Sequence, residues 1–201
     1  MMFKFGKNIN QKKQGYTCRQ AGMTYVELIV VLSIFSVMTS VVLFNYNKFE
    51  DKIDIKVLAN DIALKIVEAQ KSALSGKLPA IPPADWKPSY GINFDTSSID
   101  EKKKFTFFTN FNNDFYDASD SVLDQPIITK SNTISKLEAM GCSPTQVDNI
   151  SIVFKRPSSR ALIASDGLSL ACASSVQITV SSPELINSVI EVYSSGRVQI
   201  N

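Results

Sequence analysis

The stretch Ala21-Gly22-Met23-Thr24-Tyr25-Val26-Glu27-Leu28 opens an apolar run that continues to Phe44. No residue between Glu27 and Lys48 carries a charge. Because a helix rises about 1.5 Å per residue, residues 28–47 are long enough to cross a bilayer core of roughly 30 Å. The sequence therefore predicts a transmembrane helix over about residues 28–47, with one carboxylate just before it.

Glu27 is the unusual residue of this segment. Placing an ionisable side chain at the mouth of a membrane helix costs a few kcal/mol unless it finds a partner, so such a residue suggests a function. Its position alone leaves a second interpretation open, in which the carboxylate simply snorkels to the membrane surface.

The residues before the apolar run are basic, contain no acid and end in glycine. The basic residues are Lys4, Lys7, Lys12, Lys13 and Arg19. An ordinary secretory signal is cut after its apolar segment, whereas here the small residue comes before it. Cleavage at Gly22 would leave the membrane helix on the mature protein. The positive charges predict that the leader stays in the cytoplasm and that the rest is exported.

This layout resembles the N-terminal signal of type IV prepilins and pseudopilins, and the match lies at Gly22, Met23, Thr24, Glu27 and Leu28. The resemblance implies that a prepilin peptidase cuts between Gly22 and Met23 and methylates the new amine of Met23. It also implies that Glu27, with Thr24 beside it, acts in assembly docking. The carboxylate that meets the new amino terminus would be Glu27 of a neighbouring subunit or of the same chain.

The resemblance implies a structural function, as a minor pilin or outer-layer pseudopilin of a type IV pilus or type II secretion pseudopilus. The implied partners are prepilin peptidase, other pilin or pseudopilin subunits that bind through the N-terminal helix, and the inner membrane assembly platform. The implied location is the inner membrane, crossed once with the N-terminus inside and the head outside, and then the filament. Two alternatives are a filament-tip binding module for DNA uptake or adhesion, and a signal-anchored enzyme or sensor.

The composition argues against an enzyme. The formal net charge is +2, but without the five basic leader residues the remainder has 16 basic and 19 acidic residues. The chain has no histidine, which removes imidazole acid–base catalysis and the commonest zinc ligand. It also lacks a nucleophile-elbow motif, a phosphate-binding glycine loop and a Cys-x-x-Cys pair. We therefore expect no catalytic residues and no obligatory cofactor.

A second helical pattern follows the membrane segment. Asp51 to Ser75 contains neither Gly nor Pro, and Gly76 is a natural helix stop. Apolar residues repeat at spacings of three and four, which predicts one buried stripe: Ile55, Leu58, Ile62, Ile66, Ala69 and Ala73. The predicted organisation is a leader over 1–22, a long helix over 23–76 and an exported head over 77–201. The arrangement resembles the pilin lollipop, although the kinking proline of many family members is absent from residues 43–47.

The head shows the pattern of short strands with tight turns, which predicts a mainly antiparallel sheet and an α+β fold. The expected strands are Tyr90–Asp95, Lys104–Thr109, Asn149–Lys155, Arg160–Ser165, Ser175–Ser182, Val189–Tyr193 and Arg197–Ile200. Residues 131–145 are ambiguous, and one helical turn is an open interpretation. The late strand pair and the Tyr-Gly-Ile-Asn-Phe segment resemble the GspH/FimT-type branch of pseudopilins and minor pilins.

Two cysteines remain after the leader, which itself contains Cys18. Cys142 and Cys172 both lie in the exported part, where an even pair is most simply a disulfide. Two buried free thiols are the alternative.

One loop has the spacing of a calcium site. Asn110, Asn112 and Asp114 place oxygens at alternate positions, the Tyr116 carbonyl follows, and Asp117 or Asp120 could close the site. Phe115 replaces the expected glycine and two ligands are neutral amides, so a plain turn rich in Asn and Asp remains the alternative.

Two basic clusters are the candidates for nucleic-acid binding under the tip-module alternative. They are Lys102-Lys103-Lys104, followed by Phe105 and Phe107, and Lys155-Arg156 with Arg160. Such charge runs more often form a solvated turn.

Overall fold

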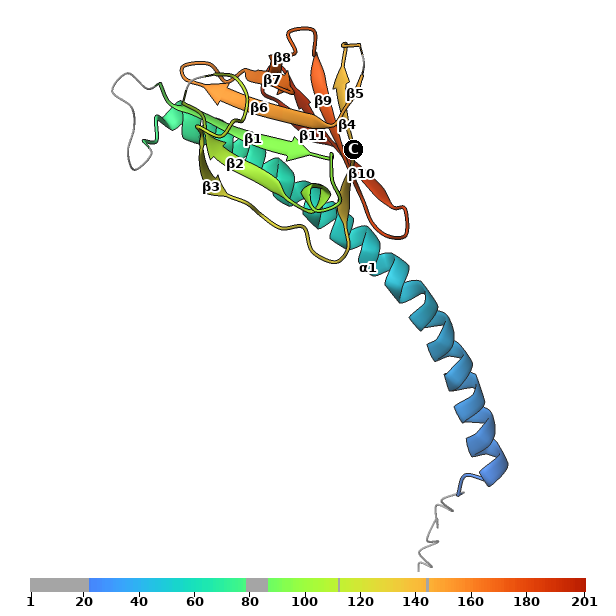
Figure 1. Ribbon diagram of the computed structural model, residues 1–201. Helices are drawn as coiled ribbons and strands as arrows, with labels where there is room; N and C mark the ends of the chain where they lie inside the picture. Colours follow the sequence, from blue (N-terminus) through green and yellow to red (C-terminus); the bar gives the residue numbers. More distant parts are fainter. Residues whose placement is uncertain (1–21, 79–86, 112, 144) are drawn as a thin grey trace, which may run out of the picture. The chain divides into compact units, whose positions relative to one another are not determined.

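The computed structural model describes residues 22–78, 87–111, 113–143 and 145–201. The fold is α+β, with one N-terminal apolar helix and two antiparallel sheets (Figure 1). The chain divides into two units, residues 1–44 and residues 45–201. The only α-helix in the described ranges is α1, Tyr25–Ser75, which begins in the first unit and ends in the second.

The second unit, the head, contains eleven described strands and one short 3-10 helix, Glu101–Lys103. The six-stranded sheet has the order β3-β2-β1-β6-β7-β8 and the five-stranded sheet the order β11-β10-β9-β4-β5. The strands are β1 Ser89–Asp95, β2 Phe105–Thr109, β3 Ser121–Asp124, β4 Thr133–Met140, β5 Gln146–Val147, β6 Asn149–Lys155, β7 Ala161–Ser165, β8 Leu168–Ser169, β9 Ser175–Ser181, β10 Asn187–Tyr193 and β11 Val198–Ile200. All of their pairings are antiparallel.

The part of α1 within the head is a core element. Its fully buried residues repeat at spacings of four and three: Ile55, Ala59, Ile62, Ile66, Ala69 and Ala73. The predicted stripe was wrong at one position, since Ala59 lies in the core and Leu58 is only partly buried at its edge. Small alanines on the stripe let the helix approach the sheets closely. The same core includes inward side chains from both sheets, such as Ile92 and Ile178.

The helix ends where the sequence predicts. Gly76 has φ +68°, a left-handed conformation that suits glycine. The Gly76 N–H donates to the Ala73 carbonyl at 3.2 Å and the Lys77 N–H to the Ser72 carbonyl at 3.2 Å. These two bonds form a Schellman motif, which satisfies carbonyls that the last turn leaves unpaired.

Every strand predicted from alternation is present within one or two residues of its expected ends. The interpretation of residues 131–145 as ambiguous with one helical turn was wrong, because Thr133–Met140 forms β4 in the five-stranded sheet. The short strands β3, β5 and β8 were not predicted. Each of them lies at an edge of its sheet.

Candidate functional site

The N-terminal end of α1 is built by Thr24. Its hydroxyl accepts a hydrogen bond from the Glu27 N–H at 3.2 Å, and its carbonyl accepts the first helical bond, from the Leu28 N–H at 3.1 Å. Thr24 is therefore the N-cap, and Glu27 three residues later occupies the acidic position of a capping box. The Thr-x-x-Glu spacing is a helix-start signal that our reading of the sequence did not use.

The Glu27 carboxylate is exposed. No hydrogen bond or ion pair reaches it from the part of the chain that the structure describes. Its backbone N–H is already satisfied by Thr24. Gly22 and Met23, the two residues of the predicted cleavage site, are exposed beside it. The structure thus places these four residues at one accessible helix end, while residues 1–21 of the predicted leader lie outside the described residues.

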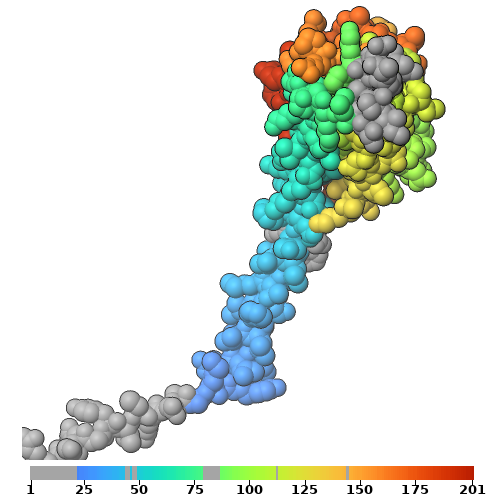
Figure 2. Space-filling view, turned by 90° about the vertical axis from the view of Figure 1, so that its left-hand side faces the viewer, coloured from blue at the N-terminus to red at the C-terminus, as the bar shows by residue number. Residues whose placement is uncertain are grey.

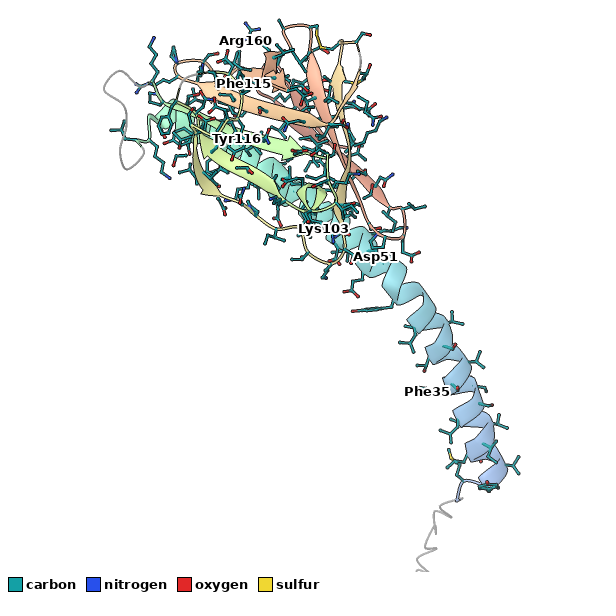
Figure 3. All side chains as sticks on the ribbon, viewed as in Figure 1. Phe35, Asp51, Lys103, Phe115, Tyr116 and Arg160 are labelled. Carbon is teal, nitrogen blue, oxygen red and sulfur yellow. A yellow bond between two sulfur atoms is a disulfide. The ribbon has the colours of Figure 1, made fainter. Side chains whose placement is uncertain are left out.

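From Leu28 to Leu43, α1 carries no charged side chain. The segment Tyr25–Leu43 is long and apolar enough to cross a membrane, and none of it is buried by other parts of the chain. Figure 3 shows its side chains, Phe35 among them, radiating from a bare helix. Large residues around the whole circumference are exposed, including Leu32, Phe35 and Met38 at 57%, 67% and 66%.

Two hydroxyl groups within this segment bond to the helix itself. The Ser33 hydroxyl donates to the Val30 carbonyl at 2.8 Å, and the Thr39 hydroxyl donates to the Phe35 carbonyl at 2.8 Å. Such back-bonding lets a hydroxyl enter apolar surroundings without leaving its proton unpaired. This segment can therefore be covered by lipid tails or by other apolar helices.

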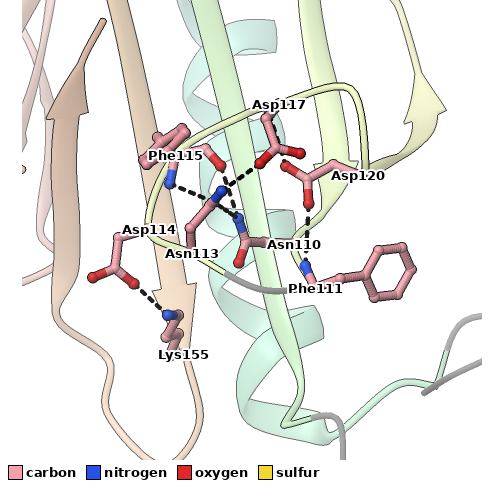
Figure 4. Close-up of polar contacts among 8 residues, drawn as sticks. All are labelled: Asn110, Phe111, Asn113, Asp114, Phe115, Asp117, Asp120 and Lys155. Atoms are coloured by element: carbon pink, nitrogen blue, oxygen red, sulfur yellow. Dashed lines mark hydrogen bonds and ion pairs between the residues drawn. The ribbon is translucent and has the colours of Figure 1, made fainter. Parts of the chain in front are cut away.

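The loop proposed for calcium is held by its own hydrogen bonds (Figure 4). Asn110 is buried, and its amide donates to Asn113 Oδ1 and to the Phe115 carbonyl, both at 2.9 Å. The Asn113 amide donates to the Asp117 carboxylate, while Asp114 forms an ion pair with Lys155. Asn112 lies outside the described residues. In the described ranges no three His, Cys, Asp or Glu side chains gather as metal ligands. The calcium site stays a prediction.

The same loop has a packing function that the sequence did not reveal. The Tyr116 ring lies 5.0 Å from the Phe108 ring, and the Tyr116 N–H donates to the Ser151 hydroxyl at 3.1 Å. Phe108 and Val153 are fully buried yet belong to the face of the six-stranded sheet turned away from α1. The loop therefore covers this outer face. Asp120 supports it by accepting the Phe111 and Asp117 N–H groups, and burial raises the pKa of its carboxyl.

Two of the basic residues proposed for nucleic-acid contact are already paired with acids. Lys104 pairs with Glu101 at 2.8 Å, and Lys155 pairs with Asp114. Arg156 lies at the C-terminal end of α1, where a Cβ added to Gly76 would come within 2.7 Å of Arg156 Nη1. Lys155 and Arg160 line one cavity of about 360 Å³. A contiguous row of phosphate contacts would need these groups free on one face.

The two cysteines of the head, Cys142 and Cys172, are joined by a disulfide, with an S–S distance of 2.03 Å. It ties the turn after β4 to the segment before β9, and Cys142 packs against the core. Among the described residues, the bond belongs to the scaffold of the five-stranded sheet.

The chain matches no protein-family model, no curated protein and no solved structure. Its function is therefore inferred from the residues and their geometry. The feature that distinguishes the molecule is α1, an apolar segment with one free carboxylate at its start, continued by a stripe that fits the core of the head.

Proposed function

We propose that this chain is a structural subunit of a type IV pilus or secretion pseudopilus, as a minor pilin or outer-layer pseudopilin. The observation that carries the proposal is the fully uncovered apolar segment Tyr25–Leu43, which carries a single carboxylate, Glu27, near its start. An apolar surface of this size is stable only against lipid or other apolar helices. In a filament, a bundle of such helices would cover this apolar surface after the protein leaves the bilayer.

The maturation chemistry follows from the helix start. Cleavage between Gly22 and Met23 would create an amine on Met23, four residues before Glu27. An amine and a carboxylate that enter apolar surroundings must find partners of opposite charge, because an unpaired buried charge costs several kcal/mol. Thr24 caps the helix through the Glu27 backbone and leaves the carboxylate available for that pairing. The partner amine belongs to a neighbouring subunit or to the same chain.

The head fits the pilin-like arrangement in which the C-terminal part of the long helix packs on a β-sheet domain. The buried stripe from Ile55 to Ala73 supports this. We further propose that the chain is first held in the inner membrane, with the leader inside and the head outside. The disulfide Cys142–Cys172 is consistent with an exported head, since such bonds persist in oxidising compartments. The tip-module alternative has less support, because Lys104 and Lys155 are already paired with Glu101 and Asp114.

The maturation half of the proposal is tested by expressing the full chain in membranes with and without an active prepilin peptidase. Intact-mass spectrometry should find a chain that begins at Met23 and is heavier by one methyl group, only when the peptidase is present. A chain that keeps Met1 in the presence of the active peptidase would contradict the proposal.

The assembly half is tested with Glu27→Gln, which keeps size and removes charge. We expect it to be cleaved normally and to be lost from sheared filaments, because the amino terminus then lacks its anion. Asp51→Asn is the matched control, since it removes a carboxylate from the same helix outside the apolar segment. Equal incorporation of the two variants would refute the docking role of Glu27.

A further inference from the structure

β3 is an open edge of the six-stranded sheet. It pairs with β2 on one side only and stands at the end of the strand order. In the described ranges no other segment bonds to the backbone of Ser121–Asp124, so the N–H and C=O groups on its outer side face solvent. All four residues are exposed, and Val122 and Leu123 are each 44% exposed. An edge of this kind is a template for another strand.

A groove lies beside this edge, between β3 and α1. We call it the α1–β3 groove. It is lined by Leu58, Asp61 and Leu64 of α1 on one side and by Asp124, Pro126 and Ile127 on the other, and it encloses about 380 Å³. In Figure 2 the chain after β3 lies directly beside the helix in the head. Leu64 and Ile127, at 66% and 75% exposure, are apolar side chains without cover.

The wall of the groove that follows β3 is held in place. The Ile128 N–H donates to the Lys103 carbonyl at 2.7 Å, and Ile127 forms a β-bridge with Lys104. On the other side Lys65 fixes β3 to α1 through Asp124, at 3.0 Å. A site whose walls are already ordered loses less entropy when a ligand binds.

The charges of the groove indicate the chemistry of its occupant. Lys65 is shared by two carboxylates, Asp124 at 3.0 Å and Glu68 at 3.2 Å. Asp61, which is exposed, has no cationic partner among the described residues. Three acids therefore face one lysine. A ligand that supplies a further cation beside apolar side chains would complement this surface.

We infer that the α1–β3 groove binds an extended peptide segment of another protein, which adds a strand to β3. The peptide side chains that point into the groove would be apolar where they meet Leu64 and Ile127. The last of them would be a lysine or arginine beside Asp61. Strand addition supplies main-chain hydrogen bonds, and the alternating side chains supply selectivity. Pairing is limited to the four residues of β3, because Pro126, two residues after Asp124, lacks an N–H. This inference does not depend on the filament proposal.

A second copy of this chain fits the edge less well. β3 has an acid at each end, Asp120 before it and Asp124 as its last residue. Antiparallel pairing of two β3 strands brings the Asp120 end of each copy opposite the Asp124 end of the other. Like charges placed directly across a strand pair are destabilising. A basic peptide has no such conflict.

The test uses the purified full chain in detergent and a fluorescent synthetic probe, acetyl-Thr-Val-Thr-Val-Thr-Lys-Thr-amide. One control peptide carries Glu in place of Lys, and a second is N-methylated at alternate residues, so that it keeps its side chains and loses strand pairing. We expect the probe to bind, the N-methylated peptide to show no binding, and the Glu peptide to bind more weakly by about tenfold. Equal binding of the probe and the N-methylated peptide would overturn strand addition, and so would the absence of any binding.

Exposed residues allow variants that leave the core untouched. Asp61→Lys should weaken probe binding by about fivefold or more, as should Leu64→Ser. The matched controls are Glu184→Lys, another exposed acid, and Leu74→Ser, an apolar α1 residue outside the groove. Sedimentation is measured in parallel. If the parent chain is a dimer that Leu123→Lys dissociates, and if the probe does not bind, the partner of β3 is a second copy of the chain. That result would refute the inference.

Discussion

Gly196 lies against the backbone of Ser159: a Cβ placed on Gly196 would stand 2.0 Å from the Ser159 carbonyl oxygen. Gly196 also has φ +88°, and its own N–H donates to the Tyr193 carbonyl at 2.8 Å. The two residues belong to different sheets, since Ser159 lies in the β6–β7 turn and Gly196 in the β10–β11 turn. Their contact joins the ends of the two sheets.

Gly196→Ala should destabilise the head. The added methyl group would clash with the Ser159 carbonyl oxygen, and the alanine would have to adopt a left-handed backbone conformation. We expect a loss of about 2 kcal/mol or more in the free energy of unfolding, measured by chemical denaturation of the full chain in detergent. The control is Ser195→Ala, at the exposed neighbouring position, which should change little. Equal stability of the two variants would show that the turns separate easily.

Gln70 connects α1 to this junction. Its side-chain amide donates to the Ser159 carbonyl at 2.9 Å and to the Gly196 carbonyl at 3.1 Å. Gln70→Glu keeps the shape but cannot donate at neutral pH, so two carbonyls would face a carboxylate. We expect a loss of about 1–3 kcal/mol in unfolding free energy. Gln146→Glu, an exposed glutamine with the same change, should cost little; if both cost the same, the two bonds carry no stability.

The sequence predicted the elements whose pattern is regular over many residues. The α1 stripe, the Gly76 stop and strands such as β6 and β9 follow directly from periodicity, and Cys142 and Cys172 were the only candidates for a bond in the head. β4 was missed because its pairing with β9 shifts register between Ile134 and Lys136. The bulge turns both Ile134 and Leu137 inward, three residues apart, which imitates helical rather than strand spacing.

The candidate site was predictable only where the pattern is local. Thr24 and Glu27 lie three residues apart, so their relation can be read from the sequence, although we had read it as docking and not as a cap. The cover that Tyr116 forms over Phe108 depends on how β1, β2 and β6 pair, which no local spacing encodes. Lys155 is paired with Asp114 and Arg156 lies beside Gly76, and both of these neighbours are distant in sequence.

Glu191 on the outer side of the five-stranded sheet should titrate below its ordinary range. Ser175 donates to its carboxylate at 2.7 Å and Tyr193 at 2.9 Å, and these hydrogen bonds lower its pKa. The folded state therefore releases the proton more readily than the unfolded chain. The resulting stability is present above the unfolded pKa and is lost as the pH falls through the folded pKa.

Carboxyl carbon NMR can measure how much each of the two hydrogen bonds lowers the pKa of Glu191. Ser175→Ala should raise the pKa of Glu191 more than Tyr193→Phe does, because the Ser175 hydrogen bond is the largest cause of the shift. Each variant should also reduce the acid-range dependence of unfolding on pH. A pKa that stays the same in Ser175→Ala would mean that the hydroxyl does not hold the carboxylate in solution.

Removal of the disulfide should weaken the five-stranded sheet. The bond closes a loop with a sequence separation of 30 residues, which in the chain-entropy model is worth roughly 3–4 kcal/mol. Cys142→Ser, Cys172→Ser and the double variant should therefore lower the melting temperature by similar amounts. A reducing agent should lower the melting temperature of the parent chain and leave that of the double variant unchanged. Additive losses in the two single variants would indicate separate packing effects instead of one bond.

Asn110→Asp tests what holds the loop over the outer face of the six-stranded sheet. The buried Asn110 amide donates to Asn113 Oδ1 and the Phe115 carbonyl, and a carboxylate of the same shape would repel both acceptors. We expect a loss of about 2–3 kcal/mol and faster chymotrypsin cleavage at Phe115 and Tyr116, as the loop leaves Phe108. Asn187→Asp, an exposed asparagine, is the matched control. If the added carboxylate instead lets calcium protect the variant from cleavage, the loop is a cation site and its hydrogen bonds are secondary.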